Sequence, residues 1–334
     1  MPKENTISKK DMRGFLEHLN KERKLIGPID TGKVIEFRET TADNILMDDR
    51  VPYKSIKEYY FPQTELMFTF KDGEVTDNTS IQGYVIFGAR PCDIEALRIM
   101  SIVYTTGKYA DPFFKRRFET NLLIGVACKE QKPECFCQET GVDKEFSDFC
   151  DILLFDNGES YTVDHLSEKG LKALENYPPL SKINPPPSPA RNNTDELSSH
   201  HRVTLDTGKD DSAYFEIIDW KKVTETCKGC GICTYTCPTC YCFDFKDVSK
   251  KGEAKRYKCW DSCMYPKFTL HASGHNPREN RHERYRQRVL HKYKYVPENF
   301  DRVVACTGCG RCVRNCPVGI NIKSIVQQIM ENEA

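Results

Sequence analysis

The sequence CKGCGICTYTCP at residues 227–238 returns in altered form as CTGCGRCVRNCP at residues 306–317. Both copies have the spacing C-x2-C-x2-C-x3-C-P. In proteins that hold two [4Fe–4S] clusters, three thiolates of such a run surround one cluster, and the fourth thiolate, before the proline, ligates the other cluster. The proline is suited to begin a helix, where its missing N–H costs nothing. The repeat therefore predicts a pair of [4Fe–4S] clusters.

The crossed pattern divides these cysteines into two ligand sets. For the first cluster, called cluster I, the predicted ligands are Cys227, Cys230, Cys233 and Cys316. For the second, cluster II, they are Cys306, Cys309, Cys312 and Cys237. We expect the backbone amides near the motif glycines to approach the sulfides and tune the reduction potential; these are Gly229, Gly231, Gly308 and Gly310. Zinc explains the repeat poorly, because structural zinc sites commonly use separated C-x2-C pairs.

The composition limits the class of protein. The chain has 334 residues, with 49 Lys plus Arg and 49 Asp plus Glu. This balance argues against a general nucleic-acid binder, which usually has a basic excess. No apolar run reaches the roughly 18 residues of a transmembrane helix, and the polar first residues carry no export signal. The 17 cysteines of such a chain favour reduced, metal-binding thiolates. We expect a cytoplasmic protein of anaerobic metabolism that does not contact a membrane.

The N-terminal part alternates strands with helices. Short, continuous apolar runs are typical of strands buried on both faces, as in a parallel sheet, and they occur at 83–88, 121–127 and 152–155. Apolar residues with helical spacing predict helices at 8–24, 94–100 and 166–176. This alternation favours an α/β domain.

The whole chain is predicted to be an α+β protein in three parts. Residues 1–180 form the α/β domain, and residues 181–212 form a Pro-rich linker. Residues 213–334 form a mostly helical, ferredoxin-like domain with the two [4Fe–4S] clusters. A long insertion separates its two cysteine motifs.

Further cysteines follow two predicted strands of the N-terminal domain. They are Cys92, in FGARPCDIEAL, and Cys128, Cys135 and Cys137, in VACKEQKPECFC. Two neighbouring strand ends could bring all four together, and four thiolates complete the ligand set of a third iron–sulfur cluster, most simply [4Fe–4S]. The alternative is that they are ordinary buried thiols. Cys150 stands alone and is expected to be structural.

Two features of the insertion between the motifs, its cysteines and a basic stretch, have more than one interpretation. Cys240, Cys242, Cys259 and Cys263 form a rival location for the additional iron. A basic stretch from Arg278 to Lys294, with interleaved tyrosines, is either the solvated face of an amphipathic helix, a contact for an acidic partner, or an RNA-binding patch.

Several segments resemble one known family. They are FGARPCDIEALRIM, DPFFKRR, CFCQETG, CGICTYTCPTCYCFD, WDSCMYPKFTLHASGHNPR and CTGCGRCVRNCPVGI. They resemble the beta subunit of cytoplasmic sulfhydrogenases and, equally, the corresponding iron–sulfur subunit of anaerobic sulfite reductase. Cys240, Cys242 and Cys263 match the pattern of that family, whereas Cys259 is not required by it.

The resemblance implies an electron-relay subunit of an oxidoreductase complex. Its expected partners are a flavin subunit that handles NAD(P)H and a catalytic metal subunit, a NiFe hydrogenase or a sirohaem sulfite reductase. The chain lacks G-x-G-x-x-G after a strand and G-x-x-x-x-G-K-[ST], so it offers no recognisable nucleotide site. We expect no catalytic residue. The alternative functions are a zinc-stabilised nucleic-acid-binding protein and a free-standing enzyme with an open iron site.

Overall fold

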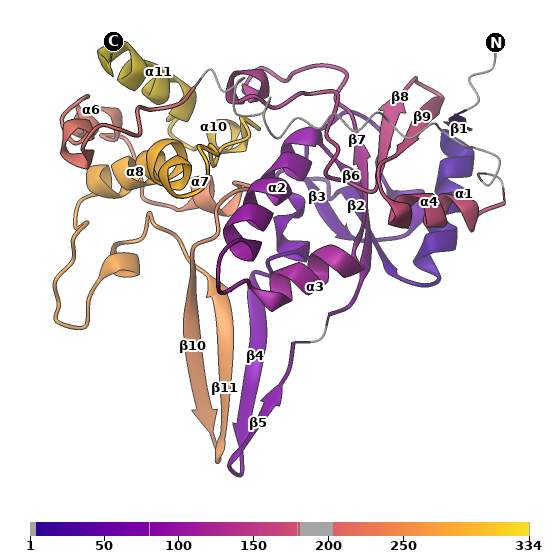
Figure 1. Ribbon diagram of the computed structural model, residues 1–334, viewed down its shortest axis with the longest axis horizontal. Coiled ribbons are helices and arrows are strands. Elements are labelled where there is room, and N and C mark those ends of the chain that lie inside the picture. Colours follow the sequence, from indigo (N-terminus) through magenta and orange to yellow (C-terminus); the bar gives the residue numbers. More distant parts are fainter. Residues whose placement is uncertain (1–4, 80, 179, 181–202, 334) are drawn as a thin grey trace.

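The computed structural model describes residues 5–79, 81–178, 180 and 203–333 (Figure 1). Residues 181–202 of the predicted linker lie outside this range. The larger sheet contains β1 Thr6–Ser8, β2 Lys24–Asp30, β3 Ile35–Glu39, β6 Tyr84–Ala89, β7 Leu122–Val126, β8 Ile152–Asp156 and β9 Ser160–His165. Its strand order is β1-β9-β8-β7-β6-β2-β3, and the four central strands β8, β7, β6 and β2 are parallel.

Helices cover both faces of this sheet, which explains the continuous apolar runs in its strands. The helices are α1 Lys9–Asn20, α2 Pro91–Thr105, α3 Pro112–Thr120 and α4 Glu168–Glu175. Phe87 packs in one apolar cluster with Phe15 of α1 and Leu174 of α4. Its neighbour Ile86 packs on the opposite face with Leu97 of α2. The predicted strands and helices of this α/β part are confirmed, and α2 is longer than expected.

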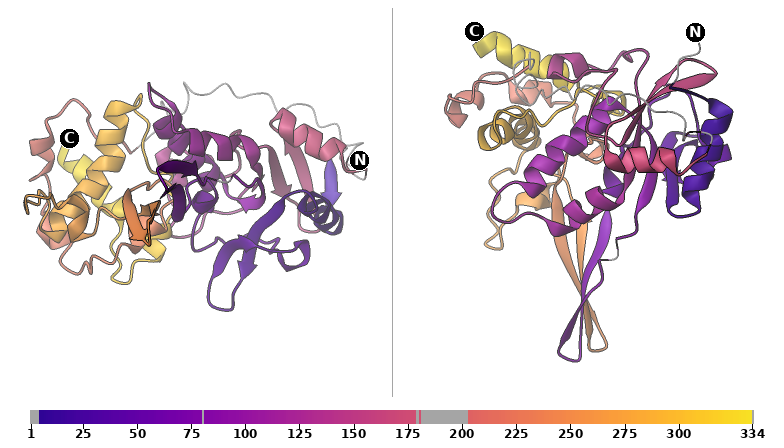
Figure 2. Two further views of the ribbon diagram at one scale, coloured as in Figure 1. Left: turned by 90° about the horizontal axis from the view of Figure 1, so that it is seen from below. Right: turned by 45° about the vertical axis from the view of Figure 1, so that its right-hand side comes forward.

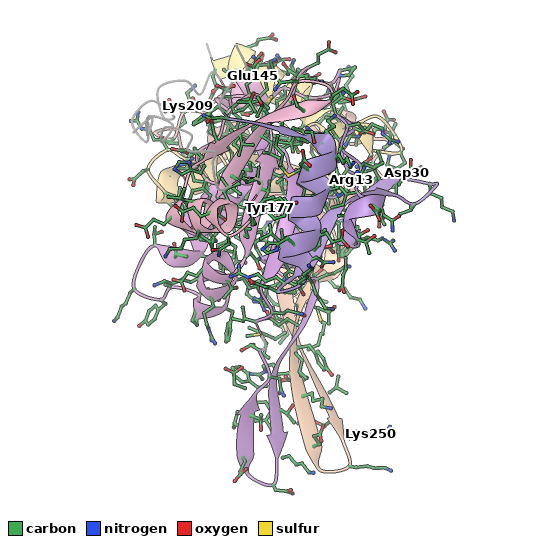
Figure 3. All side chains as sticks on the ribbon, turned by 90° about the vertical axis from the view of Figure 1, so that its right-hand side faces the viewer. Arg13, Asp30, Glu145, Tyr177, Lys209 and Lys250 are labelled. Atoms are coloured by element: carbon green, nitrogen blue, oxygen red, sulfur yellow. The ribbon has the colours of Figure 1, made fainter. Side chains whose placement is uncertain are left out.

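A second, four-stranded antiparallel sheet projects from the body as an arm (Figures 1 and 2). It contains β4 Thr64–Lys71, β5 Glu74–Asp77, β10 Phe243–Lys250 and β11 Glu253–Trp260, in the order β10-β11-β4-β5. Figure 3 labels Lys250, at the end of the β10–β11 hairpin, near the tip of the arm. The β4–β11 pairing joins the N-terminal part to the insertion, so it crosses the boundary that the Pro-rich segment suggested. The division into domains stays a prediction.

The C-terminal part combines short helices with the arm. Its helices are α6 Trp220–Val223, α7 Ile232–Tyr235, α8 Arg281–Leu290, α9 Val296–Asn299, α10 Arg311–Arg314 and α11 Ile322–Glu333, and a π-helix covers His291–Tyr295. Trp220, Tyr285, Tyr293 and Ile325 contribute to one apolar core. The β10–β11 hairpin was not predicted, because the insertion was expected within a mostly helical domain. Among the described residues, no helix is both long and apolar enough to span a bilayer.

A buried ion pair fastens the second cysteine motif to the α/β part. Arg311 Nη1 and Nη2 lie 2.7 and 2.8 Å from the two carboxylate oxygens of Asp93 in α2. Both side chains are 0% exposed. The Arg311 Nε group also donates to the carbonyl of Pro52, at 3.1 Å. All three interactions tie α10 to the N-terminal half of the chain.

Replacing Asp93 by Ala should destabilise the folded chain by about 3–5 kcal/mol, because the guanidinium of Arg311 would stay buried without its counter-charge. The measurement is the midpoint of thermal unfolding. The control is Asp30→Ala, since the Asp30–Arg50 pair is 47% exposed on each side and should contribute less than about 1 kcal/mol. Equal effects of the two substitutions would contradict the expected role of the buried pair.

Candidate metal centres

Each cysteine motif is a loop followed by one short helical turn. Gly231 and Gly310 precede α7 and α10 and have φ angles of 77° and 70°, which favour glycine. The third cysteine of each motif lies inside the turn. We expected a helix to begin at Pro238 and Pro317; this is wrong, because each proline begins a turn after the fourth cysteine. The short helix instead lies before that cysteine.

The first motif and the last cysteine of the second motif share a cavity. The cysteines that line it are Cys227, Cys230, Cys233, Cys312 and Cys316. Met264 and Tyr285 add apolar wall, and Arg288 adds a cation. Cys316 therefore lies with the three cysteines of the other motif, as the crossed pattern requires. Cys230 is exposed, so this cavity reaches the surface.

The remaining motif cysteines form a second, more buried group. Burial raises the pKa of Cys306, and it raises the pKa of Cys309 to about 12; the thiol of Cys237 adjoins both. Cys237 Sγ lies 3.3 Å from Thr239 Oγ1, which donates to the carbonyl of Ala305 at 2.7 Å. Cys312 adjoins Cys306 and Cys309 and also lines the first cavity, so it lies between the two groups.

The N-terminal cysteines meet at a third cavity. Cys92, Cys128, Cys135 and Cys137 all line it, together with Cys309 of the second motif. Cys92 is at the start of α2, directly after β6, and Cys128 follows β7. Because β6 and β7 are parallel neighbours, their carboxyl ends lie at one edge of the sheet. The proximity expected from the two strand ends is thus observed.

The third cavity and the second cysteine group are in direct contact through backbone. A Cβ atom at Gly308 would lie 2.5 Å from the amide nitrogen of Cys137, and one at Gly310 would lie 2.6 Å from the carbonyl oxygen of Glu134. The amide of Phe136 donates to the carbonyl of Gly308 at 2.7 Å. These two glycines therefore allow the N-terminal loop to pack on the second motif, a role that their sequence context alone does not indicate.

Of the remaining cysteines, Cys240 lies beside Cys237, and Cys242 and Cys263 lie beside each other near Cys240. The thiol of Cys240 hydrogen-bonds that of Cys237, and the thiol of Cys263 hydrogen-bonds that of Cys242 and lowers the pKa of Cys242 to about 7. Buried Lys57 donates to the carbonyl of Cys240 at 2.8 Å.

Two cysteines lie elsewhere. Cys259 lies in β11 within the arm, opposite Asp244 of β10 in the strand register. Cys150 is buried in the apolar core, as expected of a structural residue.

One face of the basic stretch is buried and not solvated. Arg284, Arg288 and Lys292 are only 2–4% exposed. Their side chains point to the cysteine loops: Arg284 Nε donates to the carbonyl of Met264, at 3.0 Å, and Arg288 Nη2 to the carbonyl of Cys233, at 3.1 Å. The spacing of four residues, which places all three cations on one helix face, is visible in the sequence. Only the fold shows that this face is covered.

Several of the buried polar atoms without a protein partner lie on or beside the cysteine motifs and the helix that follows the insertion. These are Arg288 Nε and Nη1, Tyr293 Oη, Thr307 Oγ1 and Arg314 Nη2. Arg288 lines the first cavity, Tyr293 adjoins Cys306, and the charge of Arg314 acts on Cys135. All are donors, and the sulfides and thiolates of an iron–sulfur cluster are acceptors. The residues present therefore fit such clusters. Within the described residues, no three Cys, His, Asp or Glu side chains converge on a single metal ion.

Comparison with known proteins defines the class. Residues 226–320 match the family model described as a 4Fe-4S dicluster domain. The chain is thus an iron–sulfur protein with [4Fe–4S] clusters. Over 328 residues it is 29% identical to the sulfhydrogenase 2 subunit beta of Pyrococcus furiosus, and the match covers 95% of each chain. This similarity runs over nearly the whole chain and, together with the dicluster domain, confirms the resemblance to the beta subunits of sulfhydrogenases. No solved structure matches it.

Two cysteine substitutions test the crossed ligation. Cys316→Ser should perturb the cluster that the first motif holds, although Cys316 belongs to the second motif. Cys312→Ser should perturb cluster II instead. The measurement is the electron paramagnetic resonance spectrum of the reduced, cluster-loaded chain. Crossed ligation is wrong if both substitutions perturb one cluster and spare the other.

Proposed function

We propose that this protein relays electrons through three [4Fe–4S] clusters, in the spatial order cluster I, cluster II, N-terminal cluster. Each cluster, when bound, accepts and releases one electron at a time. The proposal is carried by the continuity of the three cysteine groups: Cys312 adjoins the first and second groups, and Cys309 adjoins the second group and the N-terminal cavity. The predicted ligand sets are proposed unchanged for all three clusters.

The contacts between the groups support an uninterrupted path. Cys135 Sγ lies 3.5 Å from the carbonyl oxygen of Cys309. At Gly308 and Gly310 the backbone of the N-terminal loop packs so closely on the second motif that no side chain fits at these two positions. On the other side, the cavity of cluster I opens at Cys230, where a partner can approach. Electrons could thus enter at one end and leave at the other.

The two ends suit two different partners. A cluster exchanges single electrons, whereas NAD(P)H gives a hydride, so a flavin must stand between them. We propose that a flavin subunit handles NAD(P)H at one end. A catalytic metal subunit, of the NiFe hydrogenase or sirohaem sulfite reductase type, would receive the electrons at the other. The alternative of an RNA-binding protein loses its support, because Arg284, Arg288 and Lys292 are buried.

Iron content tests the number of clusters. Three cubanes predict about twelve irons per chain, and Cys128→Ser should reduce this to about eight by removing the N-terminal cluster. Cys150→Ser is the matched control, because Cys150 lies in the apolar core and should leave the iron content unchanged. A value near eight in the unaltered chain would exclude the third cluster and leave the pair.

Reduction of the isolated chain tests the relay. We expect dithionite to reduce the cluster-loaded chain, while NADH and NADPH leave it oxidised until the flavin subunit is added. The measurement is the bleaching of the broad visible absorbance of the clusters. Oxidation of NADH or NADPH at a catalytic rate by the chain alone, or stoichiometric flavin retained on it, would make the chain an enzyme in its own right.

A further inference from the structure

Two buried cations lie one helical turn apart beside the cysteine groups. Arg288 is in α8 and Lys292 is in the π-helix that continues it, and each is 2% exposed. Neither forms an ion pair with a carboxylate anywhere in the described part of the chain. A buried charge without a partner is costly, so a compensating anion is needed. The nearest candidates are the thiolates and clusters.

Arg288 faces cluster I and reaches toward cluster II. It lines the first cavity with Cys227, Cys230, Cys233 and Cys316. One of its nitrogens, Nη2, is fixed by the carbonyl of Cys233, while Nε and Nη1 have no protein partner. These free donors belong to a side chain that lines the space assigned to cluster I. Cys312, which is assigned to cluster II, lines the same cavity.

Lys292 faces cluster II alone. Its Nζ donates to Thr239 Oγ1 at 2.9 Å and to the carbonyl of Ala305 at 3.1 Å. Thr239 Oγ1 in turn lies 3.3 Å from Cys237 Sγ, and Ala305 directly precedes Cys306. The ammonium group is therefore held one hydroxyl group away from a ligand assigned to cluster II. It does not line the cavity of cluster I.

We propose that Arg288 and Lys292 set the reduction potentials of the two ferredoxin-like clusters: Arg288 raises both, and Lys292 raises that of cluster II alone. This rests on the ligand sets proposed above. Reduction adds negative charge to a cluster, and a fixed cation nearby stabilises the reduced form, strongly so where the dielectric constant is low. Arg288 and Lys292 are thus potential-setting residues that act without contact with any substrate.

Lys294 provides a matched comparison in the same π-helix. It is also 2% exposed, but it pairs with Glu298 and lies 3.3 Å from a carboxylate oxygen of Asp211. Its charge is therefore compensated by carboxylates, and it should not affect either cluster. Replacing Lys294 removes a buried lysine that lies two positions after Lys292 in the sequence.

The experiment compares Lys292→Gln, Arg288→Gln, Arg288→Lys and the control Lys294→Gln in the full, cluster-loaded chain. Redox titration followed by electron paramagnetic resonance measures each cluster, with signals assigned from the Cys316→Ser and Cys312→Ser spectra. In Lys292→Gln, the ratio of reduced to oxidised cluster II at a fixed potential should fall about tenfold, a downward shift of about 59 mV for a one-electron couple. Cluster I should not change.

Arg288→Gln should lower both potentials, and Arg288→Lys should restore most of the loss because it keeps the charge. Unchanged potentials in Lys292→Gln and Arg288→Gln with full iron content would overturn the proposal, as would an equal shift in Lys294→Gln. If Arg288→Gln loses its iron, the reduction potentials of Arg288→Lys and Lys292→Gln still test the proposal. An unaltered chain that holds no pair of clusters would instead contradict the proposed function itself.

Discussion

The buried ion pair between Arg311 and Asp93 is the constraint on which the arrangement of the cysteine groups depends. Arg311 stands between Cys309 and Cys312, and Asp93 directly follows Cys92. Two hydrogen bonds fix the planar guanidinium against the carboxylate, in a site with no solvent exposure. Such a pair has one good geometry, so it fixes the second motif relative to the N-terminal cavity.

Close backbone packing extends this fixation to the loop of Cys135 and Cys137. Gly308 and Gly310 flank Cys309, and neither position has room for a Cβ atom. The same residues that shape the second cysteine loop therefore also receive the N-terminal loop. Rigid juxtaposition suits electron transfer, because it keeps the distances between the cluster sites short without any motion of the protein.

The sequence was sufficient to predict which cysteines come together where their positions depend on local spacing or on neighbouring strands. The crossed placement of Cys316 follows from the motif itself, and the meeting of Cys92 with Cys128 follows from two adjacent parallel strands. What could not be predicted depends on contacts between distant segments. The partner of Arg311 lies more than 200 positions away in the chain, and the burial of Arg288 and Lys292 requires the cysteine loops to fold over α8. The expected helix after each proline was wrong because the helical turn comes before the fourth cysteine.

The arm has a consequence for the way the chain is made. Strand β4 is paired with β5 on one side, and on the other side with β11, where Leu66 faces Tyr257. During synthesis, the N-terminal half emerges first and folds while β11 does not yet exist. Until then β4 presents an unpaired edge, which can pair with strands of other chains. The nascent protein thus passes through an aggregation-prone stage. This stage ends only when the β10–β11 hairpin is complete.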